Sequence, residues 1–239
     1  MNPGRKCPPQ STTSFQSPAQ IGLIEQTSNR GQHCITIFLD VDGAFNKTNL
    51  DGVVKAMREN DYPETFVNWY EAFVMNQIAS VDTGMTACKR RLTLGVPQGS
   101  LTSPHSWNVY FESILEEANA GPAKVVGFAD DSSMSFAGPD LGTVQQIAQY
   151  TISRIVEYGK DLDISFNPGK TEVMHFGKDP EPDFDLKELI MNGHSIPYSE
   201  EVTYLGMKLN RKLDWSPHVD AKIKVAKRKL MQLHSSIGK

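Results

Sequence analysis

The sequence predicts an α+β fold in which an antiparallel sheet carries helices on one face. The expected elements run strand, helices, hairpin, helix, hairpin, helix and strand, an order that contains a split β-α-β-β-α-β pattern. The composition, with 39% hydrophobic and 22% charged residues among 239, is that of a globular chain able to bury a sizeable core. The sequence contains no internal repeat and no linker long enough to separate independent domains.

The first elements are expected to be an arm, a helix and a buried strand. Residues 1–16 are rich in Pro, Ser and Thr, which predicts a flexible N-terminal arm. Ser17 followed by Pro18 is typical of an N-cap with proline in the first helical turn, so we expect a helix over 18–30. The apolar, β-branched stretch 34–41 predicts a buried strand.

Two helices and a hairpin are expected next. Asn49 is a suitable N-cap for a helix whose apolar residues follow helical spacing: Leu50, Val53, Val54 and Met57. A second, aromatic-rich helix is expected from about Pro63 to Met75. Residues 77–94 predict a hairpin that turns near Asp82.

Glycine, proline and asparagine delimit the later elements. A Gly/Pro-rich loop at 94–104 leads into a helix over about 104–120. The remaining expectations are a tight hairpin around 130–131, a long helix over 141–162, a turn at 167–169, a strand over 171–176, short strands within 188–209 and a basic helix from 217 almost to the C-terminus.

The charge is distributed unevenly along the chain. The net charge is −4 and the isoelectric point is near 5.9, which taken alone argues against a nucleic-acid-binding protein. Residues 206–239, however, contain nine basic and two acidic residues, a net charge of +7, so the rest carries −11. This division suggests an acidic body that handles cations and a basic end that contacts polyanions; a solvated helix face is the alternative.

The sequence argues against secreted and membrane-spanning classes of protein. Cys7, Cys34 and Cys88 lie far apart without a CxxC pair, which argues against a disulfide framework and a zinc knuckle. No apolar run approaches the ~18 residues needed to span a bilayer, and the first residues lack the apolar core of a signal peptide. We therefore expect an intracellular protein without membrane contact, in the nucleus or the cytoplasm.

Carboxylates end two of the expected strands. Asp40 and Asp42 close the first strand, where alternation places both side chains on one face. Asp130 and Asp131 lie at the tip of the second hairpin, where adjacent side chains usually point to opposite faces. Each is an ordinary residue at a strand end or turn when taken singly, but the four together suit a hard divalent cation, above all Mg²⁺.

Two loops add features that are weak when taken singly. The segment 95–100, GVPQGS, combines two glycines with a proline and precedes a helix, so its backbone can approach an anionic ligand closely. The segment 167–171, NPGKT, is a turn that presents Lys170 beside a strand. An ordinary loop and an ordinary turn are the alternatives.

Together and in order, these features resemble the successive palm motifs of reverse transcriptases. The matching segments are FLDVDGAFN (38–46), GVPQGSLTSP (95–104), FADD (128–131) and NPGKTEVMHF (167–176). YLGMKLNRKLDW (204–215) is similar to the stretch that follows the palm in the enzymes of non-LTR retrotransposons. The resemblance covers about residues 20–239.

The resemblance implies a right-hand polymerase palm, whose sheet is of the ferredoxin-like split β-α-β type. It implies a palm with a remnant of the fingers over 17–187, and a palm–thumb connection with the first thumb helix over 188–239. Most of the fingers are not found before the first palm strand, so we expect the chain to belong with other domains of a larger retroelement polyprotein.

The resemblance also implies the catalytic residues. It places the catalytic carboxylates at Asp40, Asp130 and Asp131, which with the backbone carbonyl of Val41 would hold two Mg²⁺ ions, with Mn²⁺ as a substitute. Asp42 is not carried over. The implied reaction is RNA-directed DNA synthesis, with an RNA template, a DNA primer and deoxynucleoside triphosphates as partners.

Further residues are implied to contact nucleotide and nucleic acid. Phe45 resembles the aromatic residue under the sugar of the incoming nucleotide, where it excludes a 2′-hydroxyl; a core aromatic is the alternative. Gln98 and Gly99 resemble loop residues at the template and nascent base pair, and Lys170 resembles a lysine near the leaving phosphates. The first thumb helix is implied to face a primer–template duplex with its basic residues: Lys222, Lys224, Lys227, Arg228 and Lys229.

The sequence departs from the family pattern at two places, and two other functions remain open. Asn46 stands where the family usually has Asp, and Thr102, His105 and Ser106 replace apolar residues more common in that loop. One alternative is a truncated or domesticated domain that binds nucleic acid or a partner without polymerising. The other is an RNA-dependent RNA polymerase, against which Phe45 and the FADD sequence argue.

Overall fold

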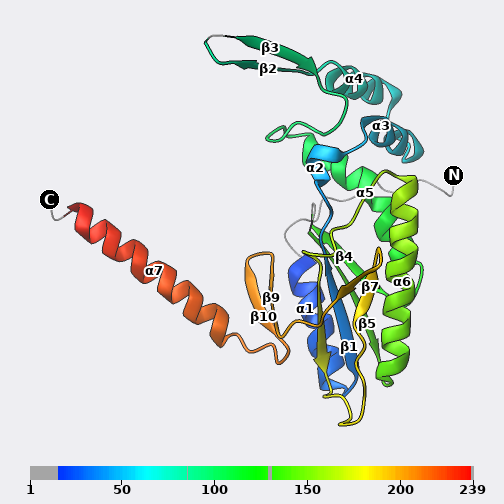
Figure 1. Cartoon of the computed structure of the whole chain (residues 1–239), viewed down its shortest axis with the longest axis vertical. Coiled ribbons are helices and arrows are strands. Elements are labelled where there is room, and N and C mark those ends of the chain that lie inside the picture. The colour runs from blue at the N-terminus through cyan, green and yellow to red at the C-terminus, as the bar shows by residue number, and fades with distance from the viewer. Residues whose placement is uncertain (1–15, 85, 129–130, 238–239) are drawn as a thin grey trace, which may run out of the picture.

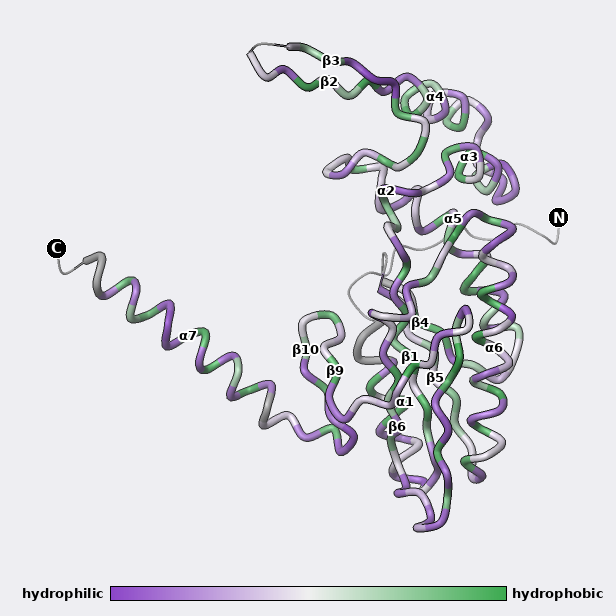
Figure 2. Tube along the Cα trace, viewed as in Figure 1, coloured by the Kyte–Doolittle hydropathy of each residue, from purple (hydrophilic) through white to green (hydrophobic). Residues whose placement is uncertain are grey.

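The computed structural model describes residues 16–84, 86–128 and 131–237. Figure 1 shows a body of sheet and helices from which a hairpin and the last helix project. In Figure 2, apolar residues recur along the strands of the body, whereas the last helix alternates short apolar and polar stretches along its length.

The body is built on a four-stranded antiparallel sheet with the strand order β4-β5-β1-β6. The order is that of the split β-α-β-β-α-β arrangement, so the predicted fold class is confirmed. Its strands are β1 (His33–Leu39), β4 (Lys124–Phe128), β5 (Asp131–Gly138) and β6 (Glu172–Gly177).

Alternation along β1 divides the interior into two layers of packing. Ile35, Ile37 and Leu39 face the main core, together with residues of α5 and α6. Cys34 and Phe38 face a second, smaller core that includes residues of α1. The prediction of helices on one face was therefore wrong in this detail, because β1 is apolar on both faces and the second face also needs a cover.

Apart from the short helix after β1, the helices form where local patterns predicted them. Asn49 caps α3 by accepting a hydrogen bond from the Gly52 amide (3.0 Å), and the four predicted apolar residues of this helix are buried. Asp140 caps α6 in the same way through the Thr143 amide (2.7 Å). The helices are α1 (Gln16–Asn29), α2 (Ala44–Lys47), α3 (Leu50–Glu59), α4 (Glu64–Met75), α5 (Ser103–Asn119), α6 (Leu141–Asp161) and α7 (Ser216–Ile237).

Two elements project from the body on the same side in Figure 1. The first is the hairpin of β2 (Ile78–Asp82) and β3 (Ala87–Arg91), in which every described residue is exposed. The Arg91 guanidinium donates two hydrogen bonds to the carbonyl of Met75, which fixes the base of the hairpin to the end of α4. The second is α7, whose base contacts β10.

Two small hairpins follow the central sheet. The first comprises β7 (Leu189–Met191) and β8 (His194–Ile196), the second β9 (Glu201–Tyr204) and β10 (Met207–Asn210). β7 packs against α6. In the second hairpin, the Tyr204 ring lies 5.0 Å from the Phe38 ring, and the Ser133 hydroxyl donates to the Tyr204 hydroxyl (3.2 Å).

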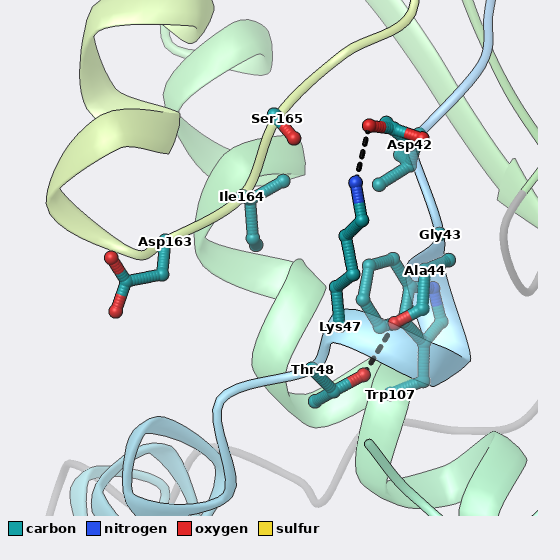
Figure 3. A pocket seen from close by; sticks show the side chains of 10 residues that line it. Asp42, Gly43, Ala44, Lys47, Thr48, Trp107, Asp163, Ile164 and Ser165 are labelled. Carbon is teal, nitrogen blue, oxygen red and sulfur yellow. Dashed lines mark hydrogen bonds and ion pairs between the residues drawn. The ribbon is translucent and has the colours of Figure 1, made fainter. Parts of the chain in front are cut away.

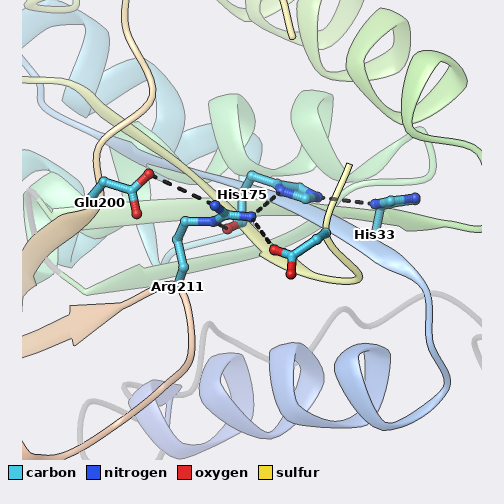
Figure 4. Close-up of polar contacts among 5 residues, drawn as sticks. His33, His175, Glu200 and Arg211 are labelled. Atoms are coloured by element: carbon cyan, nitrogen blue, oxygen red, sulfur yellow. Dashed lines mark hydrogen bonds and ion pairs between the residues drawn. The ribbon is translucent and has the colours of Figure 1, made fainter. Parts of the chain in front are cut away.

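A polar cluster ties the segment after β10 to the edge strand β6 (Figure 4). Arg211 donates to the carbonyl of His175 (3.2 Å) and pairs with Asp179 (3.1 Å) and Glu200 (3.9 Å). The buried rings of His33 and His175 are joined by a hydrogen bond of 3.2 Å. Burial, and then the Arg211 guanidinium, lower the pKa of His175 to about 4.

None of the helices within the described ranges is both long and apolar enough to cross a membrane.

Candidate active site

Asp40 and Asp131 lie side by side at one end of the central sheet. The antiparallel register of β1 and β5 pairs Leu39 with Ser132, so the next position along places Asp40 opposite Asp131. Asp131 is also paired with Phe128 of β4. Two segments that are about ninety residues apart in sequence therefore each bring a carboxylate to the same strand ends.

Both carboxylates are on the same face of the sheet. Thr36 and Ser135 are paired in the register, and their hydroxyl groups are 2.7 Å apart. Asp40 lies four residues after Thr36, and Asp131 lies four residues before Ser135, so alternation places all four side chains on one face. Cross-strand neighbours on one face have Cβ atoms roughly 4.5–5.5 Å apart, which is close enough for both carboxylates to contact one cation.

The segment after α6 fixes the backbone around Asp40 on the edge that faces away from β5. The Asp40 carbonyl accepts from the Asn167 amide (2.9 Å), and the Asp42 amide donates to the Ser165 carbonyl (2.8 Å). The carbonyl groups of successive residues in an extended strand point to opposite edges of that strand. The Asp40 carbonyl points toward Asn167, so the Val41 carbonyl points toward the other edge, where β5 begins. An oxygen acceptor therefore faces the same end of the sheet as Asp131.

The predicted carboxylate Asp130 lies outside the described residues. Within the described part of the chain, no group of three or more His, Cys, Asp or Glu is arranged to hold a metal ion. Asp40, Asp131 and the Val41 carbonyl are all hard oxygen donors, and such a set fits Mg²⁺ better than a softer ion.

Asp42 is engaged elsewhere, in a small cavity of about 10 Å³ beside the strand end (Figure 3). Its carboxylate pairs with the Lys47 ammonium at 2.6 Å, and Trp107 and Ile164 also line the cavity. This contact compensates the charge of Asp42 locally.

Phe45 is half-buried on α2, the short helix directly after the strand end. Its ring lies 6.0 Å from the Trp107 ring at 45°, and its carbonyl accepts from the Val96 amide (2.8 Å). At Gly95 (φ +85°), a Cβ atom would lie 2.7 Å from the carbonyl oxygen of Asn46. Glycine at this position therefore allows the 95–100 loop to lie directly against α2.

Gln98 also contacts α2. Its side-chain amide donates to the Oδ1 atom of Asn46 at 3.0 Å, and both residues are exposed. The loop is anchored at its other end, where the Ser103 hydroxyl donates to the Pro97 carbonyl (2.6 Å). Gly99 is exposed with φ +84°. The structure thus brings Phe45, Gln98 and Gly99 to one neighbourhood beside the strand end.

Lys170 lies in the turn that supports Asp40. The turn is closed by Asn167, whose Oδ1 accepts from the Gly169 amide (3.0 Å) and whose carbonyl accepts from the buried Thr171 hydroxyl (2.9 Å). Thr171 contacts the Asp40 amide through its Oγ1 atom (3.3 Å). Lys170 is exposed on this turn, whereas the predicted basic residues of α7 lie on the projecting helix and not at the sheet end.

Three features of this region were missed by sequence reasoning. The first is helix α2; Gly43, directly before it, adopts the left-handed conformation (φ 67°) and was the available signal for a tight turn after the strand. The second feature is the ion pair between Lys47 and Asp42. The third is Glu172, which is paired with Phe38 and so shares the face of Asp40; burial raises the pKa of its carboxyl.

The chain matches the family described as reverse transcriptase (RNA-dependent DNA polymerase) over residues 5–209. Over 192 residues it is 26% identical to a retrovirus-related Pol polyprotein from the type-1 retrotransposable element R1 of Bradysia coprophila, covering 78% of this chain and 18% of that protein. It is 21% identical over 223 residues to the probable RNA-directed DNA polymerase from transposon BS of Drosophila melanogaster, covering 88% of this chain and 24% of that protein. The chain spans about a fifth to a quarter of the length of these relatives.

The solved structures that it resembles include telomerases. A telomerase from Candida tropicalis truncated from the C-terminal domain gives a TM-score of 0.59 at 13% identity, covering 84% of this chain and 39% of that one. A telomerase from Candida albicans with a fragment of telomeric RNA gives a TM-score of 0.58 at 11% identity, covering 84% of this chain and 34% of that one. These likenesses show a right-hand polymerase fold. From the family match and these relatives, the chain belongs to the reverse transcriptase family, as a reverse transcriptase domain of the non-LTR retrotransposon type.

Proposed function

We propose that the chain is the core of an RNA-directed DNA polymerase, which adds deoxynucleotides to a primer 3′-hydroxyl on an RNA template. The observation that carries the proposal is the register of β1 and β5, which ends with Leu39 opposite Ser132 and so brings the next residues, Asp40 and Asp131, together on one face of the sheet. Membership of the reverse transcriptase family supports it. An ordinary strand-end carboxylate has no need of an acidic cross-strand neighbour, since like charges in that position destabilise a sheet.

In this proposal, Asp40, Asp131 and the Val41 carbonyl hold Mg²⁺ together with Asp130, and Mn²⁺ can substitute. Bound metal of this kind activates a hydroxyl nucleophile and neutralises the charge of the leaving phosphates. The chain itself supplies rigid placement. Hydrogen bonds from the 165–171 segment hold the backbone of Asp40, so the ligand atoms are positioned before substrate arrives.

The residues beside the strand end are proposed to select the nucleotide. The Phe45 ring packs against the Trp107 ring and its backbone carbonyl is held by the Val96 amide, and a ring held in this way would exclude a 2′-hydroxyl by contact. Gln98, hydrogen-bonded to Asn46, and Gly99 present the loop to the template and nascent base pair. Lys170 offers a positive charge for the leaving phosphates from its turn.

The proposed domain boundaries are those that the family resemblance implies. Residues 17–187 form the palm with a remnant of the fingers, and residues 188–239 form the palm–thumb connection and the first thumb helix, α7. The basic residues of α7 face the phosphates of a primer–template duplex, in which an A-like shape matters more than base sequence. Further domains of a larger retroelement polyprotein are proposed as partners.

Primer extension on an RNA template with Mg²⁺ tests the polymerase proposal. We expect Asp40→Asn and Asp131→Asn each to reduce extension by about a hundredfold or more, because each removes a charge that stabilises the transition state. Asp42→Asn is the matched control: it lies two residues from Asp40 and pairs with Lys47, so we expect a change of less than about threefold. Equal effects at Asp40 and Asp42 would contradict the assignment.

Metal binding tests the site independently of activity. We expect the chain to bind Mn²⁺, detected by electron paramagnetic resonance, and the Asp40→Asn variant to bind it at least about tenfold more weakly. A chain that binds Mn²⁺ and an RNA–DNA duplex without extending a primer would support the alternative of a domain that binds without polymerising. Extension with ribonucleotides as efficient as with deoxynucleotides would favour an RNA polymerase, and would remove the role given to Phe45.

A further inference from the structure

The side chains of Asn46 on α2 and Gln98 on the 95–100 loop are joined by one hydrogen bond. The Nε2 atom of Gln98 donates to the Oδ1 atom of Asn46 at 3.0 Å. Asn46 stands where the reverse transcriptase family usually has Asp. The exchange keeps the shape of the side chain and replaces one of two acceptor oxygens by an NH₂ donor. It therefore changes the chemistry of the contact with Gln98.

Other contacts fix the backbone that leads to Gln98. The Val96 amide donates to the Phe45 carbonyl (2.8 Å), and the Pro97 carbonyl accepts from the Ser103 hydroxyl (2.6 Å). Because the backbone is held in this way, the freedom left to Gln98 lies mainly in its side chain. The hydrogen bond to residue 46 sets the orientation of the side-chain amide.

Two side-chain amides can pair in two ways, because each has an acceptor oxygen and a donor nitrogen. In the pairing that the structure shows, Gln98 donates and its Oε1 atom is the free end of the amide. In the reverse pairing, Asn46 donates to Oε1, and the Gln98 nitrogen is the free end. Both side chains are exposed, and within the described residues neither makes another hydrogen bond, so a change of pairing breaks no further contact.

A carboxylate at position 46 would allow one of these two pairings. Both of its oxygens accept, so the Gln98 nitrogen is the end of the amide that can face it. A hydrogen bond to an ionised group is also roughly twice as strong as one between neutral groups. Asp at this position would therefore hold Gln98 in one orientation, whereas Asn46 holds it more weakly in either of two.

We propose that Asn46 is a positioning residue for Gln98 and that it lowers the discrimination between matched and mismatched nucleotides. The proposal rests on the polymerase function proposed above, in which Gln98 faces the nascent base pair. Base pairs share acceptor atoms in the minor groove, and guanine adds a donor there; a mismatch displaces these atoms. An amide held in one orientation fits the matched arrangement, whereas an amide with two orientations also fits displaced acceptors or donors.

Single-nucleotide extension of a primer on an RNA template tests the effect on selection. The measured quantity is kcat/KM for the matched nucleotide divided by kcat/KM for a mismatched one, for example dCTP and dTTP opposite guanine. We expect Asn46→Asp to raise this ratio at least about threefold over the wild-type chain. The added negative charge acts on all nucleoside triphosphates alike, so it changes each rate but not the ratio. An equal or lower ratio in Asn46→Asp overturns the proposal.

A chain that carries Gln98→Ala shows whether residue 46 acts through Gln98. A positioning residue has no effect once the side chain that it positions is absent. In this background we therefore expect Asn46→Asp to leave the ratio unchanged, although extension itself is slower. A rise of the ratio in the double variant would assign the effect to the charge of the carboxylate and would overturn the proposal.

Nuclear magnetic resonance of the Gln98 side-chain amide tests the contact without polymerisation. In Asn46→Asp, one amide proton of Gln98 should shift as the new carboxyl titrates between about pH 3 and pH 6, and the same proton in the wild-type chain should not. Absence of this shift overturns the proposal. If the shift is present but no variant extends a primer, the polymerase function is contradicted, and with it the effect on selection, so the two failures are distinguished.

Discussion

The Asp40–Asp131 strand end and α7 differ in where their packing partners lie. At the strand end, β1 is buried on both faces, its neighbours β5 and β6 are paired with it, and the 165–171 segment holds its last residues. Along α7, the apolar residues between 219 and 233 are exposed and the contact with the body is at the base. The chain thus contains the packing partners of its proposed metal site, whereas most of its proposed duplex-binding helix is exposed.

Two regions with equally clear sequence patterns can therefore have different structural requirements. The strand end needs rigid placement, because carboxylates that share a cation must be held within a fraction of an ångström. A helix that contacts a duplex through charges tolerates less exact placement, because phosphate contacts are strong without fixed geometry.

Truncating isoleucine in the two regions gives the largest contrast. Ile37 in β1 is fully buried, so we expect Ile37→Ala to lower the free energy of unfolding by about 2–5 kcal/mol. Ile223 in α7 is 44% exposed, and we expect Ile223→Ala to change the free energy of unfolding by less than about 0.5 kcal/mol. Urea unfolding of both variants measures the difference, and similar losses would show that α7 is packed in solution.

The sequence predicted well what is determined locally. The apolar spacing of α3, its Asn49 cap and the turn after Asp82 depend on neighbouring residues, and the structure confirms them. The adjacency of Asp40 and Asp131 depends on a strand register between distant segments, which no local pattern fixes. The same holds for Glu172, which reaches this face only through pairing of β6 with β1.

Other features were missed for different physical reasons. Helix α2 has four residues, too few to show a helical period, and is stabilised by its contacts with α5 and the 95–100 loop. The cover of α1 over the second face was missed because the prediction assigned all helices to one face. On α7, the excess of lysines drew attention to charge, although the apolar spacing from Val219 to Leu233 was present in the sequence.

Adding a methyl group at Gly95 tests how rigidly the loop must fit against α2. Gly95→Ala would place Cβ 2.7 Å from the Asn46 carbonyl oxygen at φ +85°, so the loop must shift. We expect unfolding free energy to fall by about 1–3 kcal/mol, measured in urea. Gly84→Ala in the β2–β3 turn has a similar φ (+77°) and no atom within 4 Å, so it serves as a control for strain without a clash.

If the two glycine variants lose the same stability, conformational strain alone explains the result. The close approach of the loop to α2 would then not be required.

Acidification tests the polar cluster that ties the segment after β10 to β6. His175 has a pKa of about 4 in the folded chain, below the ordinary value of about 6.5, so the unfolded chain takes up a proton first as the pH falls. Stability is therefore lost between about pH 6.5 and pH 4, and we expect His175 to contribute a loss of about 1–2 kcal/mol between pH 7 and pH 5.

Unfolding of the wild-type chain and of His175→Gln at both pH values measures this contribution. Glutamine cannot be protonated, so the variant should lose less stability on acidification than the wild type. His194→Gln replaces an exposed histidine and should keep the wild-type dependence. An unchanged pH dependence in His175→Gln would contradict the assigned cause.

The smallest effect is expected for the hydrogen bond between Gln98 and Asn46. Both side chains are exposed, so a double-mutant cycle of Gln98→Ala and Asn46→Ala should give a coupling free energy of about 0.5–1 kcal/mol in urea unfolding. Asn46→Asp, which restores the residue more common in the family, should strengthen the contact, because an amide donates more strongly to a carboxylate than to an amide oxygen. A coupling of zero would mean that the loop is held against α2 by its backbone contacts at Gly95 and Val96 alone. In that case, Gln98 would be free to turn toward a template without breaking any contact within the chain.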